Sequence, residues 1–322
     1  MKVLITGGSG FLGTRLLRAL LQRGSLLGQT PDEIVIADLA PPAGTLARSP
    51  GVRHLVGPLI DQCPAFVREK FDVVFHLSAA VSAECETDFE LGLRSNLEAS
   101  RALLDALKAA GNCPRFVFAS SAAVFGNDPG LPLPLVVRDD TLPTPQTSYG
   151  IQKFICEQLV ADYTRKGFIN GRSARPVTVI VRPGKPNGAA SGFLSSIVRE
   201  PLHGQPAVCP VPPDTAVAVS SPENTIAGLI AIAEAERTTL GGRTALNLPA
   251  LTVQVSDILD ALEAVAGGVS RRLVRFELNP TIAGIVRGWP AAFDNARALR
   301  LGLRPDLDVI SIIHRFVNEM QP

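Results

Sequence analysis

Residues 2–13 read KVLITGGSGFLG, and this short stretch decides the fold. Its first part, KVLIT, is a β-branched apolar run bounded by glycine, which predicts a buried strand. Gly7, Gly10 and Gly13 follow at GxxGxxG spacing, and an apolar pattern of helical period then runs to Gly24. In such a strand–turn–helix unit the glycines permit a tight turn, close approach of a pyrophosphate and packing of the helix on the sheet. The stretch therefore predicts a dinucleotide-binding turn.

Two other kinds of site are excluded by the same residues. A Walker phosphate loop carries lysine after its last glycine, whereas Thr14 follows Gly13 here. A nucleophile elbow centred on Ser9 needs glycine two residues later, where this chain has Phe11. A glycine turn with a purely structural role remains the alternative to nucleotide binding.

Composition limits the class of protein further. The chain has 322 residues, 46% hydrophobic and 19% charged, which is enough for one large domain or a large and a small one. Its net charge of +1 indicates neither a nucleic acid nor an anionic membrane as partner. The 5 cysteines and 4 histidines are scattered, which indicates free thiols in a reducing compartment and no metal site. No apolar run has the length of an export signal or a membrane span, so we expect a cytoplasmic protein.

Strands and helices alternate along the first part of the chain. Long helices are predicted over 11–24, 91–111 and 149–167, and short strands over 2–6, 33–38, 54–57, 72–79, 115–121 and 176–183. Parallel strands need helical crossovers, so this alternation predicts an α/β fold, a doubly wound parallel sheet of the Rossmann type.

The second part of the chain has a different character. After residue 183 the sequence is rich in glycine, proline and serine, and two more helical patterns follow at 224–236 and 255–267. We expect an NAD-binding domain over 1–183, to which 216–249 returns. Residues 184–215 and 250–322 are expected to form a smaller, interleaved substrate-binding region.

Two aspartates follow predicted strands. Asp38 ends the second strand, where a carboxylate can accept hydrogen bonds from the adenosine ribose and would repel a 2′-phosphate. This favours NAD over NADP, and a solvent-facing aspartate is the alternative. Asp61 follows the third strand and is a candidate partner for the adenine amino group, or is merely solvated.

A candidate catalytic pair lies in SYGIQK, residues 148–153. Tyr149 and Lys153 are four residues apart and share one face of a helix. An ammonium beside a phenol stabilises the phenolate, so we expect the pKa of Tyr149 to fall from about 10 and the residue to act as a base. Ser121 ends the preceding strand and is placed to hold the same substrate oxygen. The alternative is two ordinary helix-surface residues.

Several motifs occur together in a familiar order. They are TGGSGFLG, Asp38, HLSAA, Asn96, FASSAAVFG, SYGIQK and VRPGKPNG. In this order they resemble the extended short-chain dehydrogenase/reductases, the NAD-dependent epimerase/dehydratase family, over nearly the whole chain.

The resemblance implies roles for individual residues. Ser121, Tyr149 and Lys153 would be the catalytic set, with Lys153 also holding the nicotinamide ribose. Asn96 would support the site through its backbone and water. The remaining cofactor contacts would be the backbone of Phe11 and Leu12 at the pyrophosphate, Leu77, Ser78 and Ala79 beyond the fourth strand, and Pro183 against the nicotinamide. In relatives the helices at 90–110 and 149–166 pair across a twofold axis, which implies a homodimer.

One departure from the family pattern bears on the substrate. Nucleotide-sugar epimerases usually read R-Y-F-N after the sixth strand, where this chain has Arg182, Pro183, Gly184 and Lys185. A cation in place of that asparagine suggests a small anionic substrate, held by Lys185 and helped by Arg199. The alternative is that Lys185 and Arg199 are ordinary surface cations.

The run from Arg182 to Gln205 is similar to that of the D-erythronate dehydrogenases. This similarity implies oxidation of D-erythronate to 2-dehydro-D-erythronate. Two other functions stay open. One is a nucleotide-sugar epimerase or dehydratase that retains its NAD. The other is a non-catalytic NAD-binding regulatory protein, because a fold alone does not fix function.

Overall fold

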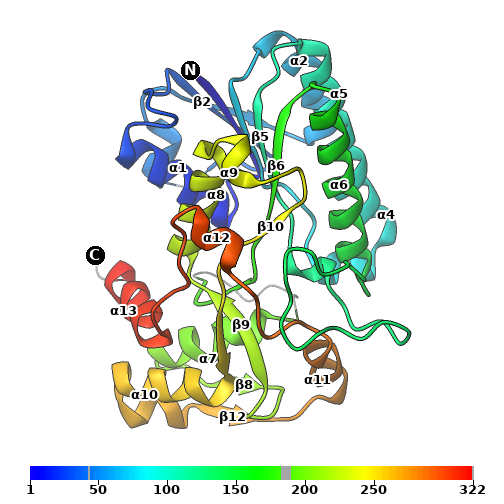
Figure 1. The fold of residues 1–322 in the computed structure, drawn as a ribbon. Helices are drawn as coiled ribbons and strands as arrows, with labels where there is room; N and C mark the ends of the chain where they lie inside the picture. The colour runs from blue at the N-terminus through cyan, green and yellow to red at the C-terminus, as the bar shows by residue number, and fades with distance from the viewer. Residues whose placement is uncertain (43, 183–189, 321–322) are drawn as a thin grey trace.

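The larger part of the molecule is built on a seven-stranded sheet. The computed structural model describes residues 1–42, 44–182 and 190–320 (Figure 1). The strand order is β10-β6-β5-β4-β1-β2-β3, and neighbouring strands pair in parallel. The strands are β1 (Lys2–Thr6), β2 (Glu33–Asp38), β3 (Val52–Val56), β4 (Val73–His76), β5 (Arg115–Ala119), β6 (Asn170–Arg175) and β10 (Leu246–Asn247). The order reverses between β1 and β4, which is where doubly wound sheets bind ligands.

Helices cover both faces of this sheet (Figure 1). One face carries α1 (Phe11–Arg23) near β1 and α8 (Pro222–Glu234) on β5 and β6, and both helices bury leucines or isoleucines in one cluster. The other face carries α2 (Leu59–Glu69), α5 (Ala99–Ala110) and α6 (Ser148–Arg165), with a second buried cluster beneath them. The predicted doubly wound α/β fold is confirmed.

The sixth strand differs from the prediction. Sequence pattern favoured residues 176–183, but β6 is Asn170–Arg175, and Thr178–Val179 forms β7 in a separate sheet. The sequence of this strand, NGRSAR, is polar, yet most of its residues are buried. Arg172 donates to the carbonyl oxygens of Ile232 (3.2 Å) and Ala233 (2.6 Å) at the end of α8, and Arg175 forms a buried ion pair. Since these guanidinium groups find partners inside the protein, the strand does not need apolar side chains.

The smaller part has its own core. A three-stranded sheet joins β7, β9 (Ala216–Ser220) and β11 (Leu251–Gln254), and β8 (Ala207–Cys209) pairs with β12 (Val274–Phe276). A buried cluster fills the space between these strands and three helices, α7 (Gly192–Leu202), α10 (Val255–Arg272) and α13 (Val309–Met320). The remaining helices are α3 (Ser82–Thr87), α4 (Phe89–Gly92), α9 (Arg237–Leu240), α11 (Pro280–Arg287) and α12 (Ala296–Arg300).

The chain crosses between the two parts more than once. After β9 in the smaller sheet, α8 packs on the large sheet and β10 pairs with β6, and the chain then returns through β11. The proposed division into two regions stays a prediction.

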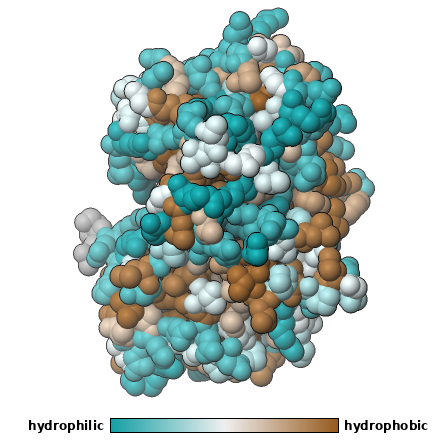
Figure 2. Space-filling view, viewed as in Figure 1, coloured by the Kyte–Doolittle hydropathy of each residue, from teal (hydrophilic) through white to brown (hydrophobic). Residues whose placement is uncertain are grey.

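Apolar side chains are not confined to the cores. Figure 2 shows them gathered over the lower half of one face, and Val208, Phe276 and Ile285 of the smaller part are exposed. No helix within the described ranges is both long and apolar enough to cross a membrane.

Candidate active site

The glycines of the turn let its backbone segments approach more closely than side chains would allow. Gly7 has φ +68° and its N–H donates to the carbonyl oxygen of Ala37 (2.8 Å). A Cβ atom on Gly7 would lie 2.7 Å from the backbone nitrogen of Ser78, and one on Gly13 would collide with the Gly7 carbonyl oxygen. Gly10 caps α1 without a side chain, and Phe11 and Leu12 form the first turn. The turn therefore fits a dinucleotide, whose pyrophosphate would meet the open N-terminus of α1.

Asp38 lies beside this turn, whereas Asp61 lies farther out. One carboxylate oxygen of Asp38 accepts a hydrogen bond from the backbone N–H of Ser9 (2.9 Å). This contact fixes the carboxylate next to the loop, where it would face an adenosine ribose. Asp61 is exposed in the first turn of α2.

The segment after β4 forms the opposite wall of the turn. Leu77 donates its N–H to the Thr6 carbonyl oxygen (3.1 Å), and the Ser78 hydroxyl donates to that of Thr6 (3.1 Å). These bonds place Leu77, Ser78 and Ala79 across from Gly7. His76 is fully buried between the hydroxyls of Thr6 (2.6 Å) and Ser100 (2.8 Å), and burial lowers its pKa to about 3. It is a neutral packing residue.

Asn96 ties the helices of the site together. It is buried in a π-helical turn, Leu93–Glu98, between α4 and α5. Its side-chain oxygen accepts from the Ala80 N–H (2.7 Å), and its amide donates to Gln152 Oε1 (2.8 Å). Extra residues in a helix of this kind are common at functional sites. Through Gln152, Asn96 fixes the helix that carries Tyr149 and Lys153.

Ser121, Tyr149 and Lys153 come together at the carboxyl end of β5. Ser121 caps a short 3₁₀ turn that follows β5, and its oxygen accepts from the Ala123 N–H (3.1 Å). Tyr149 lies in the first turn of α6. Its side chain interacts with that of Ser121 by hydrogen bonding. A Cβ on Gly150 would collide with the Ala123 carbonyl oxygen, so this glycine lets α6 approach the serine. Gly150 was not among the predicted site residues, although it lies inside SYGIQK.

Burial dominates the electrostatics of this group. It raises the pKa of Tyr149 to about 12, and hydrogen bonding with Ser121 opposes the rise. It lowers the pKa of Lys153 to about 8, because the ammonium is only 3% exposed. The expected fall in the pKa of Tyr149 is therefore wrong for the protein without its cofactor, since the cost of desolvating the phenolate exceeds the help from its neighbours.

A buried ion pair supports the same helix. Arg175 of β6 binds both carboxylate oxygens of Glu157 (2.8 and 2.6 Å), and the Ser120 hydroxyl donates to the same group (2.5 Å). Glu157 lies one helical turn after Lys153, and Ser120 precedes Ser121. Sequence reasoning missed this set because strand β6 was placed elsewhere.

The proposed substrate cations are only partly described. Lys185 and Pro183 lie outside the described residues. Arg199 is buried on α7 and donates to the Arg182 carbonyl oxygen (2.7 Å) and to Glu200 (2.6 Å). Burial, with help from the charge of Arg199, lowers the pKa of Arg182. Arg199 thus places the chain at Arg182.

The comparisons with known proteins agree with this geometry. Residues 3–215 match the model of the NAD dependent epimerase/dehydratase family. The D-erythronate dehydrogenase of Cupriavidus necator is 45% identical over 99% of this chain and 98% of its own. The enzyme of the same name from Haemophilus influenzae is 39% identical over 98% of this chain and 99% of its own. The crystal structure of a nucleoside-diphosphate-sugar epimerase from Agrobacterium tumefaciens superposes with a TM-score of 0.93, at 39% identity over 99% of this chain and 94% of that one.

The chain belongs to the NAD-dependent epimerase/dehydratase family. It is an NAD-dependent dehydrogenase, and NAD is its cofactor. The predicted family, the similarity to D-erythronate dehydrogenases and the predicted cofactor are confirmed.

Proposed function

We propose that the protein oxidises a hydroxyl of a small sugar acid with NAD, and that the substrate is D-erythronate, oxidised at C2 to 2-dehydro-D-erythronate. One observation carries the proposal. Two D-erythronate dehydrogenases, at 45% and 39% identity, are similar to this chain over almost its full length. The grouping of Ser121, Tyr149 and Lys153 at the carboxyl end of β5, on the same edge of the sheet as the glycine turn after β1, supports it.

The proposed chemistry uses three side chains. Bound NAD supplies the acceptor for the hydride, which makes the reaction a two-electron oxidation. Tyr149, as phenolate, takes the proton of the substrate hydroxyl while Ser121 holds the same oxygen. Lys153 stays cationic beside Tyr149 and holds the nicotinamide ribose. Burial makes the phenolate scarce, but it also makes it a strong base once formed, because the pKa of Tyr149 is about 12.

The other assignments follow the same fold. We propose that the cofactor is contacted by Gly7, Gly10, Phe11, Leu12, Gly13, Asp38, Asp61, Leu77, Ser78, Ala79 and Pro183, with Asn96 in support. The positions of the glycine turn, Asp38 and the segment after β4 along one edge of the sheet support this set.

The acid end of the substrate would meet a cationic region. Lys185 is proposed to hold the carboxylate and so orient the C2 hydrogen. Arg199 is proposed to help, and its hydrogen bond to the Arg182 carbonyl oxygen supports an indirect contribution through Arg182. Burial first, and then the charge of Arg199, lower the pKa of Arg182, and a carboxylate here would offset both effects.

Absorbance in the NADH band tests the reaction directly. Purified protein with NAD would be given D-erythronate, L-threonate, D-threonate and a UDP-sugar in turn. NADH growth on D-erythronate that disappears in Tyr149→Phe is the expected result. No growth on any acid would refute the proposal.

A second candidate is a nucleotide-sugar epimerase that retains its NAD. The similarity to the structure named as a nucleoside-diphosphate-sugar epimerase from Agrobacterium tumefaciens favours it. Its signature would be NAD that copurifies with the protein and a changed UDP-sugar without net NADH.

A lysine substitution tests the carboxylate contact. Lys185→Met is expected to raise KM for the acid about tenfold, with NAD affinity unchanged, because one charge-assisted contact is lost. Lys166→Met, at the exposed C-cap of α6, is the matched control. Equal kinetics in the two variants would remove Lys185 from the site.

We also propose that the protein is a cytoplasmic homodimer. The 5 free cysteines support a reducing compartment. On α6, Ile151 and Ile155 are 46% and 38% exposed on the side away from the sheet, as a helix that pairs with a second copy would require. A monomeric mass at micromolar concentration would contradict the dimer.

A further inference from the structure

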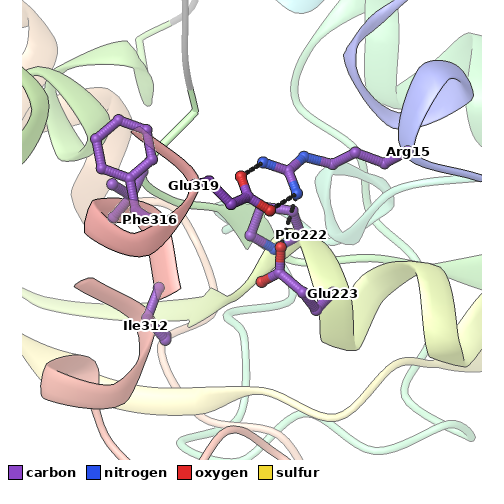
Figure 3. A pocket seen from close by; sticks show the side chains of 7 residues that line it. Arg15, Pro222, Glu223, Ile312, Phe316 and Glu319 are labelled. Atoms are coloured by element: carbon purple, nitrogen blue, oxygen red, sulfur yellow. Dashed lines mark hydrogen bonds and ion pairs between the residues drawn. The ribbon is translucent and has the colours of Figure 1, made fainter. Parts of the chain in front are cut away.

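An arginine of the first helix reaches the last helix of the chain. Arg15 lies one turn after Phe11 in α1, and its guanidinium binds both carboxylate oxygens of Glu319 in α13 (2.8 and 2.5 Å). It also donates to Glu223 at the start of α8 (2.7 Å). Figure 3 shows these three side chains meeting at the edge of a small pocket. Bidentate pairing of this kind fixes geometry as well as charge.

The same guanidinium lies next to the cofactor turn. Its central carbon is 5.1 Å from the centre of the Phe11 ring, and Phe11 begins the helix that would face the pyrophosphate. Arg15 therefore neutralises two carboxylates, Glu223 and Glu319, close to the place where NAD brings negative charge. Without Arg15 these carboxylates would repel the cofactor.

The buried face of α13 packs in the same cluster as Val181, a residue with an unusual backbone conformation. Ile312 and Phe316 border the pocket (Figure 3). Val181 lines the same pocket and belongs to the same buried cluster. Val181 is 1% exposed and has φ +57°. A β-branched residue in this left-handed region is strained and persists only where its surroundings enforce it.

Val181 directly precedes Arg182, so its backbone sets the direction of the chain there. The Arg182 N–H donates to Ser195 (3.3 Å), and its carbonyl oxygen accepts from Arg199. If Val181 relaxed to an ordinary conformation, the chain would leave this position with a different direction. The packing of α13 thus bears on the backbone at Arg182, whose carbonyl oxygen Arg199 contacts.

We propose that Arg15 is a positioning residue with two separable effects. By its charge it shields the cofactor from Glu223 and Glu319. By its ion pair with Glu319 it keeps α13 against Val181, and so keeps the backbone at Arg182 in the position where it contacts Ser195 and Arg199. The second effect rests on the proposed function, and the first does not.

Two substitutions separate the effects. Arg15→Met keeps the aliphatic stem but leaves Glu319 without this cation and Glu223 with only Arg315, 4.0 Å away. It should raise the Kd for NAD, measured by calorimetry without substrate, by about three- to tenfold at low salt, with a smaller factor in 0.5 M salt (about a 4 Å screening length). Glu319→Gln breaks the same tie but removes a negative charge, so NAD should bind as well as to the wild type or more tightly.

The substrate readout should behave differently. Both variants are expected to raise KM for D-erythronate by about three- to tenfold with little change in kcat, because uniform binding is lost. The double variant should show no larger rise in KM than either single one, since both remove one interaction. Its NAD affinity should move back toward that of the wild type.

Arg23→Met is the matched control, since Arg23 ends the same helix and pairs with Glu234 without touching α13. If Arg15→Met behaves like Arg23→Met in both NAD affinity and KM, the proposal is overturned. If Glu319→Gln weakens NAD binding as much as Arg15→Met does, the charge effect is overturned. Should the wild type oxidise no acid, the proposed function fails, while the calorimetric comparison still decides the charge effect.

Discussion

The Nζ atom of Lys153 lies 5.6 Å from the centre of the Tyr149 ring, one turn along the same helix. The ammonium is held from the other side, where it donates to the Ala119 carbonyl oxygen (2.8 Å) and lies 4.8 Å from the Phe118 ring. Strand β5 therefore fixes the cation without using the tyrosine. The phenol hydroxyl is left to interact with Ser121 and, in the proposed reaction, with the substrate.

Removing the phenol hydroxyl should stop the reaction and spare the cofactor. We expect Tyr149→Phe to lower kcat by about 10²- to 10⁴-fold, which is the usual contribution of a general base. NAD affinity by calorimetry should stay near the wild-type value. Tyr163→Phe is the matched control, because Tyr163 is the other tyrosine of the chain and binds Asp105 away from the site. A Tyr149→Phe variant with wild-type kcat would exclude a base role.

We expect kcat/KM to rise with pH up to about pH 8 and then to stay constant. The active form needs Tyr149 without its proton, with a pKa of about 12, and Lys153 with its proton, with a pKa of about 8. Below pH 8 only the phenolate fraction changes, so kcat/KM rises about tenfold per pH unit. Above pH 8 the gain in phenolate is offset by the loss of the ammonium. The profile is therefore flat until the phenol itself has titrated.

A lysine variant checks this assignment. In Lys153→Met, which is expected to be far less active, the rise should continue past pH 8, because no ammonium remains to be lost. If kcat/KM of this variant also stops rising near pH 8, the change in slope must come from another group.

Replacing Asp38 should change the choice of cofactor. Asp38→Ser removes the negative charge beside the glycine turn, so NADP is expected to become a substrate while the KM for NAD rises about tenfold. The ratio of kcat/KM for the two cofactors is the measurement. Asp61→Ser is the informative comparison, since a contact with adenine alone would weaken both cofactors equally. An unchanged ratio in Asp38→Ser would place the carboxylate away from the ribose.

Breaking the buried ion pair should destabilise the protein. Glu157→Gln leaves Arg175 charged, buried and without a counter-charge, so we expect a loss of about 3–5 kcal/mol in the free energy of unfolding. Denaturant unfolding measures it. Asp162→Asn, in an exposed pair with Arg165, should cost less than about 1 kcal/mol. Similar losses in the two variants would show that the buried pair has no special role.

The sequence was most informative where local rules and global fold agree. KVLIT, the glycine turn and Asp38 follow one another so closely that their arrangement is nearly set by the chain itself. The meeting of Ser121 with Tyr149 could also be anticipated, because parallel strand ends face one crevice.

The misplaced strand has a different cause. Arg172 and Arg175 are buried because of partners 60 and 18 residues away, the Ile232 carbonyl oxygen and Glu157, and no local pattern contains such partners. The pKa of Tyr149 was misjudged for a similar reason. Helical spacing reveals the neighbouring ammonium, but the extent of burial depends on the whole fold.

The π-helical turn at Leu93–Glu98 makes the site sensitive to chain length at one point. A π-helical turn accommodates one more residue than an α-helical turn, so deleting a single residue there would close the wide turn and move the residues inside it around the helix axis. Asn96 would then face away from either Ala80 or Gln152, both of which it now binds. A one-residue deletion here should therefore be far more harmful than the same deletion in an exposed loop. Length, as well as residue identity, is under constraint in this helix.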